Sequence, residues 1–233
     1  MKRIILIETS TALCSTALME GNTVSAYRES SEPKAHASLT AVFIQEMLQE
    51  RGLSMADCDA VCVSMGPGSY TGLRVGVSTA KGLCFGAGIP LLAVGTLDVL
   101  VAQASSASTK AGDMPEFRYV VPMIDARRME VYSAVFSPDG RQLTETAPAI
   151  IDQDSFADRL AEGPVLFIGD GAGKCRETLN HPNAYFLQCH PEASSMADLA
   201  LARLEAEDFK DVAYFEPFYL KEFVATASKK KLF

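Results

Sequence analysis

One stretch, residues 61–76 with the sequence VCVSMGPGSYTGLRVG, limits what this chain can fold into more than any other. Alternating apolar residues from Val61 to Met65 are typical of a buried strand, and the Gly-Pro-Gly sequence that follows ends it. Ser69 then stands where it can cap a following helix. A strand that leads through a glycine-rich turn into a helix N-terminus presents backbone N–H groups, which suit an anion or a closely approaching partner.

The two common phosphate-binding patterns do not fit this turn. A P-loop requires Lys and then Ser or Thr directly after its last glycine, whereas Gly72 is followed by Leu73 and Arg74. The dinucleotide-binding fingerprint places its glycines at other spacings. We therefore interpret the turn as architectural, with its glycines and Ser69 starting a closely packed helix.

Composition limits the class of protein. The 233 residues are 48% hydrophobic, which is enough apolar content for one large domain or two small ones. A formal charge of −8 argues against a chain that binds nucleic acid by itself. The six cysteines form no Cys-x-x-Cys pair and are expected to be reduced core residues. The sequence shows no signal-peptide pattern and no apolar run of membrane-spanning length, so we expect a cytoplasmic protein with no membrane partner.

The order of predicted elements indicates a duplicated α/β fold, in which each half begins with a β-meander and continues with helices and strands. The small, polar segment at residues 105–116 is the best candidate for a break between an N-terminal lobe, residues 1–105, and a C-terminal lobe, residues 106–233. Strands are predicted at residues 3–8, 12–19, 23–29, 59–65, 90–94, 118–125, 129–136, 142–150 and 164–168, and helices at 36–51, 71–87, 96–104, 153–161 and 194–206.

Four segments resemble the TsaB family, the YeaZ-type subunit of the bacterial machinery that makes threonylcarbamoyladenosine in tRNA. The sequence GPGSYTGLRVG at residues 66–76 is similar to the family signature, and residues 7–18 are similar to its opening hairpin. The sequences DARRMEVY at residues 125–132 and EPFYLK at residues 216–221 resemble its second-lobe and C-terminal motifs. The four segments lie in matching order over nearly the whole chain.

The resemblance implies a fold of the actin, hexokinase and Hsp70-like (ASKHA) superfamily, with two lobes that each start with a β-meander. It also implies a non-catalytic scaffold that activates TsaD, the subunit that transfers a threonylcarbamoyl group to N6 of adenosine 37 in tRNAs reading ANN codons. Further expected partners are the ATPase TsaE, a second copy of the chain, and tRNA contacted indirectly through the complex. No cofactor is expected on this chain, because ATP or ADP and the metal are expected on the partner subunits.

The alternative is a metal- or nucleotide-dependent hydrolase, glycopeptidase-like, or a kinase of the same fold. The catalytic relative holds a metal with a His-x-x-x-His pair on its first helix, but here His36 is followed four residues later by Thr40, a poor ligand for such an ion, so no metal site is expected. Glu8 stands where related kinases have an aspartate, although we interpret it first as a carboxylate that bonds the Thr9 or Ser10 turn. The residues proposed to lie near any nucleotide are Glu8, Ser10, Gly169, Asp170 and Gly171.

The two first-lobe helices predict a binding surface. Phe85 projects with Arg74 and Lys81 onto the expected polar stripe of residues 71–87, and an aromatic side chain there needs a neighbour. In the helix at 36–51, one apolar stripe can pack on the sheet while a second would stay exposed unless a partner covered it. The predicted partner interface consists of His36, Leu39, Phe43, Met47, Arg74, Ser78, Lys81 and Phe85.

The chain ends in a basic tail, with three lysines at residues 229–231. We interpret it as a solvated terminus, and contact with tRNA held by the partner subunit is the alternative.

Overall fold

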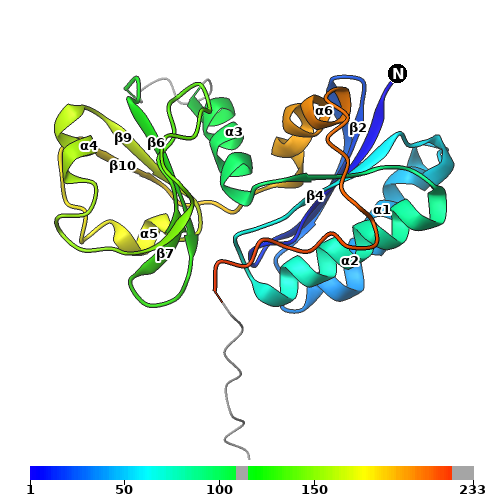
Figure 1. Cartoon of the computed structure of the whole chain (residues 1–233), viewed down its shortest axis with the longest axis horizontal. Coiled ribbons are helices and arrows are strands. Elements are labelled where there is room, and N and C mark those ends of the chain that lie inside the picture. Colours follow the sequence, from blue (N-terminus) through cyan, green and yellow to red (C-terminus); the bar gives the residue numbers. More distant parts are fainter. Residues whose placement is uncertain (109–114, 222–233) are drawn as a thin grey trace, which may run out of the picture.

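Two five-stranded mixed sheets form the frame of the protein, one in each lobe (Figure 1). The computed structural model describes residues 1–108 and 115–221. The strands of the first sheet are β1 (Arg3–Glu8), β2 (Cys14–Glu20), β3 (Thr23–Ser30), β4 (Ala60–Ser64) and β5 (Leu91–Val94), in the spatial order β3-β2-β1-β4-β5. The first three form an antiparallel meander, and β4 and β5 are parallel to β1.

The second sheet repeats this topology. Its strands are β6 (Tyr119–Asp125), β7 (Glu130–Ser133), β8 (Ala147–Ile150), β9 (Val165–Ile168) and β10 (Ala184–Leu187), in the order β8-β7-β6-β9-β10. Again a meander leads, and β9 and β10 run parallel to β6. The predicted duplicated ASKHA-type α/β fold is therefore confirmed, although β10 was not predicted from the sequence.

Helices cover both faces of the first sheet. Helices α1 (Ala35–Glu50) and α2 (Tyr70–Ala87) lie side by side on one face (Figure 1), where Ile5 and Ile7 of β1 point into their shared core. The alternate residues Ile4 and Leu6 point to the opposite face, which α6 (Ala197–Glu205) covers. Short 3₁₀ helices lie at η1 (Met55–Asp57) and η2 (Ala193–Met196).

Three helices follow the first sheet and belong to the second lobe or to the junction. Helix α3 (Thr96–Ser108) places Leu97, Leu100 and Val101 in the second-lobe core, while Val99 points into the first. The other two are short: α4 (Ala157–Glu162) and α5 (Ala172–Cys175), the second of which was not predicted. No helix among the described residues is long and apolar enough to cross a membrane.

The predicted division at residue 105 is wrong for the end of the chain. A single boundary implies one crossing between lobes, but the chain crosses back after β10. Ala193, Met196 and Ala200 are buried in the first-lobe core, and Lys210 forms a β-bridge with Leu91 of β5. Residues 193–221 therefore pack largely on the N-terminal lobe, because their apolar side chains complete its two cores.

Candidate functional site

The start of α2 packs directly against the loop between β1 and β2. A Cβ at Gly72 would lie 2.0 Å from the Thr9 carbonyl oxygen, and one at Gly68 would lie 2.4 Å from the Ser10 carbonyl oxygen. A Cβ at Gly76, one turn further, would lie 2.2 Å from the Thr9 hydroxyl oxygen. Three glycines four residues apart thus let the helix backbone reach the loop, which no residue with a side chain would allow.

Hydrogen bonds complete this contact. The Ser69 N–H donates to the Ser10 carbonyl at 2.6 Å, the Gly72 N–H donates to the Ser69 side chain at 3.3 Å, and the Thr9 hydroxyl donates to the Gly72 carbonyl at 2.9 Å. The loop therefore uses its polar groups to join helix and strand. This confirms the interpretation of the glycine-rich turn as architectural.

The Gly169–Gly171 turn of the second lobe also packs closely against neighbouring backbone. The Gly169 and Gly171 N–H groups donate to the carbonyls of Leu187 and Met123, so neither is free for a phosphate. A Cβ at Gly169 would lie 2.3 Å from the Met123 carbonyl oxygen. The N–H groups of these two glycines are therefore unavailable to a nucleotide, while the position of the turn near one stays a prediction.

Glu8 is fully buried and points into the protein. Its Oε1 accepts a hydrogen bond from the Ser10 N–H at 2.6 Å, which confirms the predicted bond to the adjoining turn, and Oε2 has no hydrogen-bond partner among the described residues. Burial raises the pKa of this carboxyl to about 7. Glu8 does not line the cleft between the lobes, and its position near a nucleotide stays a prediction.

The cleft between the lobes has a volume of about 680 Å³. Of the predicted residues, it brings together Ser10, Asp170 and His36, and burial raises the pKa of Asp170. The other lining residues include Thr11, Ser69, Tyr70, Thr71, Asp125, Arg127, Tyr132, Tyr219 and Lys221. The Tyr70 and Tyr219 rings contact each other at 4.9 Å between centroids, so part of the wall is aromatic.

His36 and Thr40 are both engaged within the first lobe. The His36 Nε2 lies 2.8 Å from the Thr11 carbonyl oxygen, and the Thr40 hydroxyl donates to the His36 carbonyl at 2.6 Å. Within residues 1–108 and 115–221, no three His, Cys, Asp or Glu side chains are grouped so that they could hold a metal ion.

The outer face of α2 exposes an aromatic side chain. Phe85 is 85% exposed, and Arg74 and Ser78 are exposed on the same stripe. The Arg74 guanidinium lies 4.3 Å from the Tyr70 ring centroid. Gly82 and Gly86 beside Phe85 have no atom within 4 Å of a Cβ position, so this face is open.

Helix α1 contributes less to this surface than predicted. Leu39 and Phe43 are half-buried, and Val42, which the sequence analysis did not select, is exposed. Met47 is fully buried in the first-lobe core, so its placement on the exposed stripe is wrong. Met47 lies about 60° from Ile44 around the helix, close enough to share the core-facing side.

Three comparisons with known proteins place the chain. A family model described as TsaD, tRNA N6-adenosine threonylcarbamoyltransferase, matches residues 29–228. The tRNA threonylcarbamoyladenosine biosynthesis protein TsaB of Escherichia coli is 31% identical over 96% of both chains. The chain belongs to the TsaB family. TsaB of Bacillus subtilis is 31% identical over 71% of this chain and 70% of its own length. The solved structure of YeaZ from Pseudomonas aeruginosa has a TM-score of 0.81 and 25% identity, covering 94% of this chain and all of that one.

A C-terminal segment of this TsaB-family protein, residues 211–221, runs along α2 (Figure 1). The Lys81 ammonium donates to the carbonyls of Ala213 and Phe215, both at 3.0 Å, and the Phe218 N–H donates to the Met65 carbonyl at 2.7 Å. Lys81 is therefore occupied inside the chain, contrary to its predicted place among free interface residues. Within this segment, EPFYLK is recognisable from the sequence only by its resemblance to the family motif. A segment without helix or strand has no periodic pattern of apolar residues.

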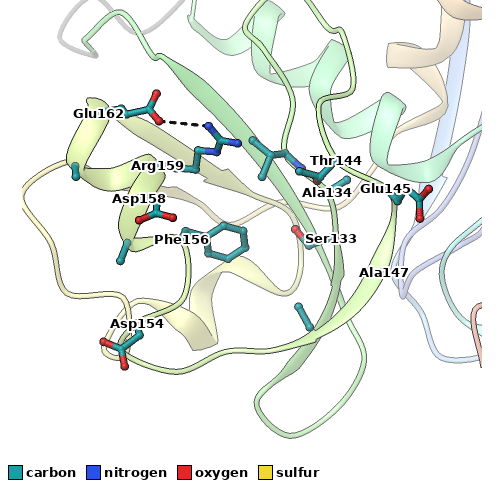
Figure 2. A pocket seen from close by; sticks show the side chains of 14 residues that line it. Ser133, Ala134, Thr144, Glu145, Ala147, Asp154, Phe156, Asp158, Arg159 and Glu162 are labelled. Carbon is teal, nitrogen blue, oxygen red and sulfur yellow. Dashed lines mark hydrogen bonds and ion pairs between the residues drawn. The ribbon is translucent and has the colours of Figure 1, made fainter.

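A second cavity of about 810 Å³ lies in the C-terminal lobe between α4 and the strands β7 and β8 (Figure 2). Its walls are the Phe156 ring and several alanines, and Glu145, Asp154 and Asp158 stand at its rim. Arg159 forms an ion pair with Glu162 at 3.3 Å. None of the residues predicted from the TsaB-family sequence lines this cavity, whose small side chains give no motif.

Proposed function

We propose that this TsaB-family chain is a non-catalytic subunit that binds and activates a TsaD-type catalytic subunit in threonylcarbamoyladenosine formation at position 37 of tRNAs reading ANN codons. The observation that supports this most is Phe85, an aromatic side chain 85% exposed on α2 between Gly82 and Gly86. Aromatic residues and arginines are both typical anchors of protein interfaces.

The partner would pack on the exposed faces of α1 and α2. Arg74, Ser78 and Phe85 would form its centre, with Val42, Leu39 and Phe43 of α1 beside them and His36 at the rim. Gly82 and Gly86 would allow a partner helix to approach the α2 backbone closely. A TsaE-type ATPase and tRNA would join through the catalytic subunit, which would hold the metal and ATP or ADP.

The chemistry of the cleft supports a role without catalysis. Glu8 points into the core, and the N–H groups of the Gly169–Gly171 turn are bonded to carbonyls. Thr40 replaces the second histidine of the metal pair and donates to the helix backbone. A hydrolase or kinase would need these groups at the cleft.

Reconstitution tests the proposal. The chain is mixed with a TsaD-type subunit, TsaE, the adenylate-forming enzyme, ATP and tRNA, and modification is measured with the chain omitted, intact or carrying Phe85→Asp. We expect omission and Phe85→Asp to abolish modification, since a charge at the centre of an apolar contact prevents association. Ile150→Asp is the matched control, because Ile150 is 76% exposed on the other lobe.

Two results would overturn the scaffold. Unchanged modification without the chain is one. The other is ATP hydrolysis by the isolated chain that Glu8→Gln abolishes, which would favour the hydrolase or kinase. Sedimentation of the isolated chain reports whether the same surface forms a homodimer, which Phe85→Asp would then disrupt.

A further inference from the structure

Two consecutive arginines form the turn between β6 and β7 in an unfavourable backbone conformation. Arg127 has φ 71° and Arg128 has φ 49°, both in the left-handed region that residues with a Cβ rarely adopt. The turn is held by the Arg127 N–H, which donates to Asp125 Oδ1 at 2.7 Å, and by the Ala126 N–H, which donates to the Glu130 carbonyl at 3.1 Å. Glycine or asparagine is the usual residue in such a turn, so the backbone conformation does not explain why two arginines stand there.

Both arginines are uncompensated. The carboxylates beside the turn are already paired, Asp125 with Lys174 at 2.5 Å and Glu130 with Lys221. Neither the Arg127 nor the Arg128 side chain forms a hydrogen bond or ion pair with another residue of the described part of the chain, and both are exposed. Two free guanidinium groups therefore stand side by side on a protein with a formal charge of −8.

The turn lies across the interlobe cleft from the N-terminal ends of α1 and α2. Arg127 lines the interlobe cleft, and the first residues of α1 and α2, including His36, Tyr70 and Thr71, line the opposite side. Arg128 does not line the cleft. Arg127 therefore borders the cleft, and Arg128 is exposed beyond its lining.

We propose that Arg127 and Arg128 contact the phosphate backbone of RNA. The catalytic subunit, which docks on the α1–α2 surface, would hold this RNA. This inference rests on the proposed function, because an acidic chain would not bind RNA alone. A backbone passing outside the cleft fits better than a nucleotide within it, since only Arg127 lines the cleft and a ligand that meets both arginines must extend beyond it. Guanidinium groups match phosphate oxygens in geometry and charge.

The test measures tRNA binding to the reconstituted complex by fluorescence anisotropy at several salt concentrations. We expect Arg127→Gln/Arg128→Gln to weaken binding about tenfold near 100 mM salt and to reduce the slope of log K against log salt by about 1 to 2. Arg127→Lys/Arg128→Lys keeps the charge and should retain most of the slope. Arg141→Gln, an exposed arginine on another turn, is the matched control.

A second variant separates contact from folding. Arg127→Asn/Arg128→Gly supplies residues suited to left-handed backbone, so we expect its Tm to rise by about 2 to 4 °C while the RNA contact is lost. A fall in Tm would overturn the argument from backbone strain.

Complex formation is followed separately by size-exclusion chromatography. If the unaltered chain forms no complex, the proposed function fails. If the complex forms and the glutamine variant binds tRNA with unchanged affinity and slope, the RNA contact alone is overturned. Loss of ATP binding to the isolated chain, with tRNA binding unchanged, would also overturn it in favour of a nucleotide in the cleft.

Discussion

The two lobes share one topology but differ in their helices. The sheet orders β3-β2-β1-β4-β5 and β8-β7-β6-β9-β10 place each meander, crossover and parallel strand in the same relative position. In the N-terminal lobe the crossover helices α1 and α2 have 16 and 18 residues, whereas the corresponding α4 and α5 have 6 and 4. Of these crossover helices, only the long pair has an outer face long enough for the proposed partner helix.

Corresponding positions also differ in what they expose. Strands β1 and β6 both end in an acidic residue, but Glu8 is buried while Asp125 is exposed and paired with Lys174. The loop after β1 is covered by α2, whereas the loop after β6 exposes Arg127 and Arg128. The N-terminal lobe thus buries the acidic residue that ends its first strand and exposes a helix face. The C-terminal lobe exposes charged side chains at the turn between β6 and β7.

The glycine turns test whether both lobes depend on the same close packing. Gly72→Ala and Gly169→Ala should each lower the free energy of unfolding by about 3 kcal/mol or more, because a Cβ would overlap a backbone carbonyl. Denaturant unfolding measures this. Gly82→Ala is the control within α2, where the site is open and alanine should stabilise by about 0.5 to 1 kcal/mol. Tolerance of alanine at position 72 would contradict the packing described.

Because Glu8 is buried and Asp125 is exposed, we expect only Glu8 to make the free energy of unfolding depend strongly on pH. The pKa of Glu8 in the folded protein is about 7, above its ordinary value of 4.5, so the folded state binds the proton more tightly. Its stabilising contribution is complete below pH 4.5 and falls by about 3 kcal/mol as the pH rises to 7 and above. Glu8→Gln should remove this fall, which unfolding at pH 5 and pH 8 would measure. Asp125→Asn should leave it unchanged.

The exposed aromatic tests whether partner binding belongs to one lobe. Phe85→Ala should weaken binding of the TsaD-type subunit by about 2 kcal/mol, or roughly 30-fold in Kd, measured by calorimetry. Ile150→Ala on the C-terminal lobe should change Kd less than twofold. Equal effects of the two substitutions would mean that both lobes contact the partner.

The smallest expected effect concerns the C-terminal segment that runs along α2. Lys81→Met keeps the apolar stem but removes the two hydrogen bonds to the carbonyls of Ala213 and Phe215, at a cost of about 1 to 2 kcal/mol. Hydrogen exchange should then show faster exchange in residues 211–218. Lys210→Met is the control, because its side chain bonds Asp208 outside α2. Unchanged exchange would mean that Val212 and Phe215 hold the segment by packing alone.

The sequence determined the fold class, the meanders and the long helices, because periodicity records which residues of each element are apolar. It also identified the glycine turn as architectural, since the residue types required by a phosphate loop are missing. Periodicity does not say what covers an apolar face: Met47 proved to be core, and residues 193–221 returned to the first lobe.

Only the tertiary structure decided which polar groups are free. Glu8 and Lys81 look available in the sequence, but each is bonded within the chain. Arg127 and Arg128 lie in the DARRMEVY segment, which was selected only by resemblance, and the sequence does not predict their left-handed turn because arginine is not typical of one. The predicted residues 229–231 lie outside the described part of the chain. The residue type determines which hydrogen bonds and ion pairs a side chain can form. Its neighbours, which come from distant parts of the chain, determine whether those bonds are already formed within the protein.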